Sequence, residues 1–123
     1  MYTLDTNAII YYFKNDRDAV PILEEIFAKD IPIYVSSITE IELFGFSNLS
    51  NKETNQIEDI LRTLAIIPVD SRIARIAGTL RRNYNLKIAD SVIAATAMFT
   101  GSTLLTRNFK DFQKIPNLLL QKI

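Results

Sequence analysis

The chain contains no cysteine and no histidine among its 123 residues. The absence of cysteine excludes disulfides, thiolate metal sites and a cysteine nucleophile. The absence of histidine excludes a Ser-His-Asp triad, zinc sites that need imidazole ligands, and the most common general base in enzymes. Any bound metal ion must therefore be held by oxygen ligands, which favours Mg²⁺ or Mn²⁺.

Glycine, proline and long apolar runs are also scarce. The three glycines and four prolines are scattered, and no linker or low-complexity tract divides the sequence. We therefore expect one domain over residues 1–123, large enough to form a core without metal or disulfide support. No run is long and apolar enough to span a bilayer, and the N-terminus lacks the pattern of a signal peptide. These absences predict a cytoplasmic protein that does not contact a membrane.

The chain has no excess of charge of either sign, because 14 Lys and Arg residues balance 14 Asp and Glu residues. The distribution is uneven, however, since Asp70 is the only acid between residues 62 and 87. A basic face in this stretch can bind phosphates, although a solvated helix face explains the same pattern. The candidate RNA-binding residues are Arg72, Arg75, Arg81, Arg82 and Lys87.

Short apolar runs alternate with longer segments of helical periodicity, which is typical of an α/β domain with a mainly parallel sheet. The predicted strands cover residues 2–4, 33–35, 66–69, 103–105 and 118–120. The predicted helices cover residues 7–13, 18–29, 38–46, 52–64, 71–83, 88–99 and 108–113. The helix over residues 88–99 is apolar on nearly all sides and is therefore expected to be buried.

Acidic residues stand at the ends of these apolar segments. Asp5 follows the first strand, Asp111 follows the fourth, and Glu42 and Asp90 lie on helices that must pack against the sheet. Ligands of open α/β sheets bind outside the carboxyl ends of the strands, so all four carboxylates can converge there. Converging carboxylates repel one another unless a cation joins them, which indicates a site for a hard divalent metal ion.

Structural explanations compete with a functional role for two of these acids. Thr6 or Asn7 can cap the helix that starts there, leaving Asp5 without a special role. Glu40 and Glu42 are two residues apart and cannot share a helix face, so Glu42 is predicted to point inward and Glu40 to be solvated. Glu42 at the edge of an apolar stripe can nevertheless simply reach solvent.

The other two acids also have simple alternatives. Asp90 lies in the first turn of its helix, where a negative charge is stabilised by the helix dipole. Asp111 can cap or solvate the last loop. The aromatic residues around the first and third predicted helices are expected mostly in the core or a subunit interface, with base stacking a weaker alternative. They are Tyr11, Tyr12, Phe13, Phe44 and Phe46.

Four segments together resemble the motifs of the PIN domain, and within it those of the VapC-type toxin ribonucleases. They are residues 4–7, 37–45, 86–97 and 105–112, which place Asp5, Glu42 and Asp90 at the family's acidic positions. Many relatives carry an acid where this chain has Asn108, so Asp111 is the nearest candidate for a fourth carboxylate. The resemblance implies a three-layer α/β/α fold with a central, mainly parallel sheet of about five strands.

The resemblance further implies a Mg²⁺- or Mn²⁺-dependent endoribonuclease, acting on RNA such as tRNA. It also implies a homodimer that is inhibited by a cognate antitoxin. Asp5, Asp90 and, through water, Glu42 would hold the metal, with Asp111 as a further catalytic candidate. Supporting roles fall to Thr6, Asn7, Thr106 and Asn108.

Three other functional classes are alternatives to the nuclease, and the sequence argues against two of them. A non-catalytic PIN-like module that binds RNA or protein is the main alternative, because Asn108 departs from the acidic pattern. A phosphatase of the haloacid dehalogenase type needs a second Asp two residues after Asp5, where this chain has Asn7. A dinucleotide-binding domain is excluded because the chain has no Gly-x-Gly-x-x-Gly run.

Overall fold

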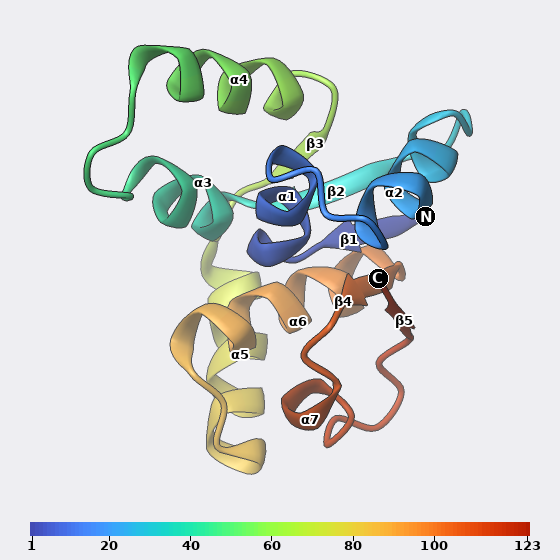
Figure 1. The fold of residues 1–123 in the computed structure, drawn as a ribbon. Coiled ribbons are helices and arrows are strands. Elements are labelled where there is room, and N and C mark those ends of the chain that lie inside the picture. Colours follow the sequence, from blue (N-terminus) through green and yellow to red (C-terminus); the bar gives the residue numbers. More distant parts are fainter.

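The computed structural model describes all 123 residues and contains five strands and seven helices (Figure 1). The strands are β1 (Tyr2–Leu4), β2 (Ile33–Ser36), β3 (Ala65–Ile67), β4 (Thr103–Thr106) and β5 (Leu120–Lys122). The helices are α1 (Thr6–Phe13), α2 (Ala19–Phe27), α3 (Ser37–Phe44), α4 (Asn51–Leu61), α5 (Ser71–Tyr84), α6 (Ile88–Thr100) and α7 (Phe109–Phe112).

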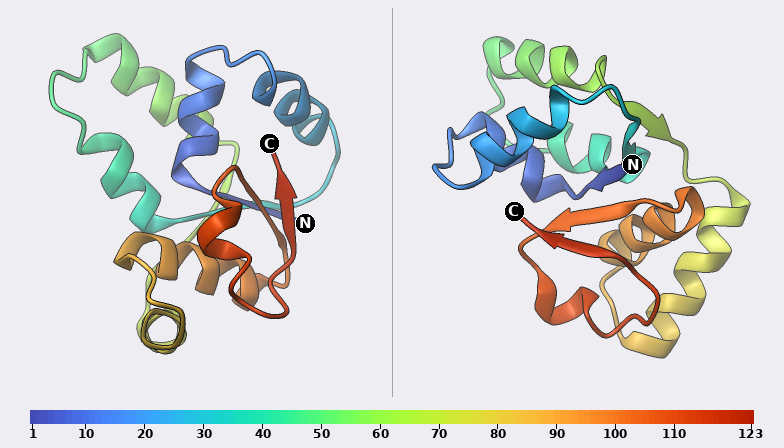
Figure 2. Two further views of the ribbon diagram at one scale, coloured as in Figure 1. Left: turned by 60° about the horizontal axis from the view of Figure 1, so that its bottom comes forward. Right: turned by 90° about the vertical axis from the view of Figure 1, so that its right-hand side faces the viewer.

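All strands run parallel in one sheet of order β3-β2-β1-β4-β5, with β1 in the centre. Helices α1 to α4 lie on one side of the sheet and α5 to α7 on the other, as the turned views in Figure 2 show. A buried cluster of 15 residues fills the first side and one of 12 residues fills the second. The predicted three-layer α/β/α architecture is therefore confirmed.

Helix α6 is the buried helix that its composition predicts. Residues 91–97 are all buried, and α6 packs along α5 and against the sheet. It ends at Gly101, whose left-handed backbone (φ 63°) favours glycine. Side-chain caps also start the two neighbouring helices, since Ser50 and Glu53 form a capping box before α4 and Asp70 is the N-cap of α5. None of the helices has the length and apolar character needed to cross a membrane.

The two edge strands differ in position from their predicted ranges. The third strand covers Ala65–Ile67 rather than residues 66–69, and Pro68 follows it because proline cannot donate to a ladder. The fifth strand covers Leu120–Lys122 rather than residues 118–120. Its limits are set by pairing with β4, from Leu104 to Thr106, and not by the apolar run that precedes it.

Candidate active site

Three of the four predicted carboxylates line one cleft at the carboxyl edge of β1. Asp5 joins β1 to α1, Glu42 lies on α3, and Asp90 lies in the first turn of α6. The acidic cleft encloses about 440 Å³. It is lined by Asp5, Thr6, Asn7, Ile10, Ile41, Glu42, Gly45, Phe46, Asp90 and Ile93. The parallel topology thus brings together residues that are distant in the sequence.

Asp5 is held rigidly by two hydrogen bonds. Its Oδ1 accepts from the backbone N–H of Ala8 at 2.8 Å, and its Oδ2 accepts from the Thr106 hydroxyl at 2.6 Å. Asp5 is therefore itself the N-cap of α1, and the alternative in which Thr6 or Asn7 forms the cap is wrong. With 6% of its surface exposed, Asp5 combines the capping role with a fixed position at the floor of the cleft.

Glu42 is held on the exposed rim of the cleft. The Thr6 hydroxyl donates to Glu42 Oε1 at 2.6 Å and lies 3.0 Å from the buried hydroxyl of Thr39. Glu40 instead lines a shallow pocket beside Arg62 on another side of α3. The two glutamates therefore diverge as their spacing predicts, and Glu42 lines the acidic cleft. Their predicted exposures are wrong, however, because Glu42 is exposed at the rim of the cleft and Glu40 is half-buried beside Arg62.

The cleft concentrates negative charge that no ion pair neutralises. Burial raises the pKa of Asp5 despite the bonds from Thr106 and Ala8, and repulsion from Asp90 and Glu42 raises it further. Burial also raises the pKa of Asp90, with added repulsion from Asp111 and Glu42. None of the three cleft carboxylates forms an ion pair, and no Lys or Arg lines the cleft.

This donor set fits a hard divalent cation. It offers carboxylate oxygens and the amide of Asn7, and its unneutralised charge favours a cation over water alone. No three acidic side chains lie close enough to form a preformed cage. Mg²⁺ does not require such a cage, because it retains several waters and commonly uses only one or two protein carboxylates.

The fourth motif lies beside the cleft and contacts it through Thr106. The backbone N–H of Asn108 donates to the Thr106 hydroxyl at 2.9 Å, and the Asn108 amide donates to Asp111 at 3.2 Å. Asp111 also lies 3.7 Å from the ammonium of Lys114. Asp111 does not line the cleft, although it is near enough to raise the pKa of Asp90.

The five basic residues predicted to contact RNA lie outside the cleft. Arg72 pairs with Asp70 and lies 4.9 Å from the centre of the Phe99 ring, while Arg81 donates to the carbonyl of Leu86. The other three side chains are exposed and make no hydrogen bond or ion pair. They are Arg75, Arg82 and Lys87. Lys87 is near enough to Asp90 to lower its pKa.

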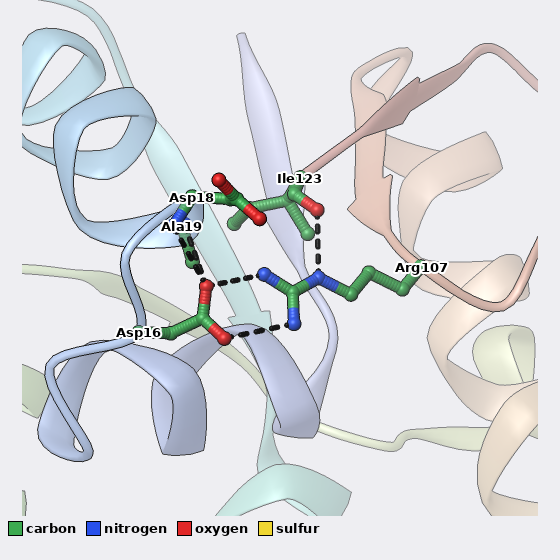
Figure 3. Close-up of polar contacts among 5 residues, drawn as sticks. All are labelled: Asp16, Asp18, Ala19, Arg107 and Ile123. Atoms are coloured by element: carbon green, nitrogen blue, oxygen red, sulfur yellow. Dashed lines mark hydrogen bonds and ion pairs between the residues drawn. The ribbon is translucent and has the colours of Figure 1, made fainter.

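Sequence reasoning missed Arg107, which directly follows Thr106 and links the end of β4 to Asp16 and Ile123. Its guanidinium makes a two-pronged ion pair with Asp16, with one bond of 3.0 Å, and its Nε donates to the carbonyl of Ile123 at 2.8 Å (Figure 3). It also lies 4.0 Å from the centre of the Tyr11 ring. Asp16 and Arg107 are 91 residues apart, and no local pattern links them.

Comparison with known proteins gives consistent matches over nearly the whole chain. The family model described as PIN domain matches residues 2–118. Ribonuclease VapC2 of Rickettsia felis is 35% identical, and the match covers 98% of this chain and 96% of the relative. A tRNA(fMet)-specific endonuclease VapC of Salmonella typhimurium is 27% identical, with 98% and 96% covered.

Solved structures show the same similarity in three dimensions. VapBC2 from Rickettsia felis, bound to a DNA fragment from its promoter, matches with a TM-score of 0.81 and 33% identity over 99% of this chain and 98% of the other. A toxin-antitoxin complex from Klebsiella pneumoniae matches with a TM-score of 0.82 and 33% identity over 100% of both chains.

Proposed function

The chain belongs to the PIN domain family, and on that premise we propose that it is a metal-dependent endoribonuclease that hydrolyses RNA phosphodiester bonds. The observation that carries the proposal is the acidic cleft, where Asp5, Glu42 and Asp90 converge and no Lys or Arg is among the lining residues. A buried, unpaired carboxylate such as Asp5 is costly unless a ligand compensates it. A cation and the phosphate that it attracts would do so.

We assign the binding of Mg²⁺ or Mn²⁺ to Asp5 and Asp90, with Glu42 acting through water. When bound, the ion supplies the positive charge and the water activation that a chain without histidine or cysteine lacks. Thr106 keeps Asp5 in one orientation, and Thr6 does the same for Glu42. Glu42, on the exposed rim, is placed to orient a water or to take its proton.

The remaining residues of the motifs are given supporting roles. Asn7 adds an uncharged oxygen to the cleft, and Asn108 fixes the turn by donating to Thr106. Asp111 acts on Asp90 through its charge and is our candidate for a fourth catalytic carboxylate. Backbone phosphates of the RNA would meet the exposed basic side chains of α5 and of Lys87.

We further propose that the protein is the toxin of a toxin–antitoxin pair, a homodimer that acts in the cytoplasm and is inhibited by a cognate antitoxin. Similar solved structures are toxin–antitoxin complexes, and a relative is named as a tRNA(fMet)-specific endonuclease. Transfer RNA is therefore the first substrate class to examine.

Cleavage of total cellular RNA by the purified protein tests the nuclease directly. We expect cutting with Mg²⁺ or Mn²⁺ and none with chelator. Asp5→Asn should lose more than about 100-fold in activity, because loss of a group that only hydrogen-bonds to a metal ligand already costs about 10–100-fold. Asparagine is also a good N-cap, so this variant should fold. If well-folded protein cleaves no RNA with either metal ion, the chain is instead a non-catalytic module that binds RNA or protein.

A further inference from the structure

We propose that Phe46 and Ile41 form an apolar wall on which an unpaired base of the substrate stacks, next to the phosphate held at the carboxylates. The inference rests on the proposed nuclease function and adds to it the part of the nucleotide that the cleft recognises. It also restricts the cleavage site to single-stranded RNA, such as a loop.

The acidic cleft has two unlike sides, and its apolar side is open to solvent. Phe46 is 48% exposed and Ile41 is 68% exposed, yet both line the cleft together with Asp5, Glu42 and Asp90. Exposed apolar side chains that gather in one groove and are rimmed by polar groups are typical of binding surfaces. The exposed ring therefore lies beside the residues that we assign to the reaction.

The charge of the cleft favours a contact that does not depend on charge. Because no Lys or Arg lines the cleft, a phosphate inside it meets three carboxylates, and the basic side chains of α5 and of Lys87 lie outside it. Stacking of a base on an aromatic ring is uncharged and tolerates any base, since every base has a π face. A volume of about 440 Å³ lies within the range of small-molecule sites and leaves room beyond a metal ion.

The backbone at the end of α3 positions Phe46 and keeps this side of the cleft open. The N–H of Gly45 donates to the carbonyl of Ile41 at 2.9 Å, which closes the last turn of the helix directly before Phe46. A Cβ on Gly45 would lie 2.6 Å from that same carbonyl oxygen. A side chain at this position would therefore displace the backbone that carries both Ile41 and Phe46.

Phe44 offers a matched control on the same segment. It is 38% exposed, which is comparable to Phe46, but it lines the shallow pocket beside Glu40 and Arg62 rather than the acidic cleft. Removal of either ring takes away a similar exposed aromatic side chain. Only the loss of Phe46 should affect a base at the cleft.

A base cannot stack on Phe46 while it is paired and stacked within a duplex. A-form RNA hides its base faces, and proteins that stack on bases do so in loops, bulges and single strands. The wall therefore favours a scissile bond next to an unpaired nucleotide, which is a stricter requirement than binding of the phosphate backbone alone.

The test begins with wild-type protein, Mg²⁺ or Mn²⁺ and total cellular RNA, with cleavage ends mapped by sequencing. A synthetic oligonucleotide with the mapped site is then used to measure KM and kcat for Phe46→Ala, Phe44→Ala and Phe46→Trp. We expect Phe46→Ala to raise KM by about 5- to 150-fold, the range that corresponds to loss of one stacked base. Phe44→Ala should leave KM unchanged. Phe46→Trp keeps an aromatic face and should raise KM far less than Phe46→Ala does.

An abasic nucleotide beside the scissile bond distinguishes stacking from a general loss of shape. Wild-type protein on the abasic oligonucleotide should match Phe46→Ala on the normal one, and Phe46→Ala should lose nothing more on the abasic form. Equal KM values for Phe46→Ala and Phe44→Ala would overturn the inference while the nuclease stands. The same conclusion would hold if Phe46→Ala left KM unchanged and only weakened inhibition by an antitoxin. Wild-type protein that cuts no RNA would overturn the nuclease, and with it the inference.

Discussion

The two ends of helix α1 carry two aspartates that the protein treats in opposite ways. Asp5 precedes the helix and accepts a hydrogen bond from the neutral hydroxyl of Thr106. Asp16 follows the helix and accepts two hydrogen bonds from the charged guanidinium of Arg107. Both aspartates also accept backbone N–H groups at the start of a helix. Burial raises the pKa of Asp5, while the bonds from Arg107 hold the pKa of Asp16 well below its usual range.

The difference shows where the fold neutralises charge and where it leaves charge available. The partners are consecutive residues at the end of β4, so one short segment holds both aspartates (Figure 3 shows the Asp16 side). At Asp16 the pairing is complete and joins the α1–α2 turn to the chain after β4. At Asp5 the hydrogen bonds fix the geometry but leave the negative charge for a ligand.

The largest contrast is expected when metal is added to variants of the two regions. Mg²⁺ or Mn²⁺ at 100 times its Kd should stabilise the wild type by about 2.7 kcal/mol, because it binds the folded state. Asp90→Asn should lose most of this gain, and Asp16→Asn should keep it even if its starting Tm is lower. Thermal melts with and without metal measure this stabilisation in each variant. An equal loss of metal stabilisation in Asp90→Asn and Asp16→Asn would contradict the distinction between the two regions.

A smaller effect is expected from the two residues that hold these aspartates. Thr106→Val removes the hydroxyl that donates to Asp5. It should weaken Mn²⁺ binding by about 10–100-fold, the usual cost of losing a hydrogen-bond partner of a metal ligand. Thr96→Val is the control, because Thr96 is also fully buried but donates only to Val92 within α6. Arg107→Lys keeps the positive charge but loses the planar guanidinium that pairs with both oxygens of Asp16. It should lower Tm and leave Mn²⁺ affinity nearly unchanged.

Isothermal titration with Mn²⁺ at fixed pH gives these affinities. If Thr96→Val weakens binding as much as Thr106→Val, the effect comes from the core in general and the specific role of Thr106 is wrong. If Arg107→Lys weakens Mn²⁺ binding more than Thr106→Val does, the ion pair of Arg107 with Asp16 contributes to the metal site. The two ends of α1 are then not separate in function.

The sequence predicts one end of α1 much better than the other, for a physical reason. Asp5 follows a short apolar strand, and strand ends in a parallel sheet meet at one edge, so its place beside Asp90 can be inferred from local patterns. The Asp16–Arg107 pair has no such pattern, since it depends on how the turn after α1 meets the end of β4. The pair forms only once the whole sheet is assembled.

Local patterns also fail where several residues can do the same work. Asp5, Thr6 and Asn7 are all good N-caps, and the choice among them is fixed by where β1 stops pairing with β4. The limits of β5 are likewise set by pairing, because Gln121 and Lys122 are polar. By contrast, the apolar composition of α6 is unambiguous, and the burial of residues 91–97 confirms the prediction that it supports.

The smallest expected effect is a difference in how stability without metal depends on pH. The folded-state pKa of Asp16 is lowered from 3.8, so its contribution is present above that pH and is lost as the pH falls. The pKa of Asp90 is raised from the same value, so its contribution is complete below pH 3.8 and is lost as the pH rises through the raised pKa. Asp16→Asn should therefore be less stable than wild type above about pH 4, whereas Asp90→Asn should gain on wild type over the same range. Urea unfolding in chelator from acid to neutral pH measures both profiles, and a shift in the same direction for the two variants would show that the carboxylates do not differ in the way the structure indicates.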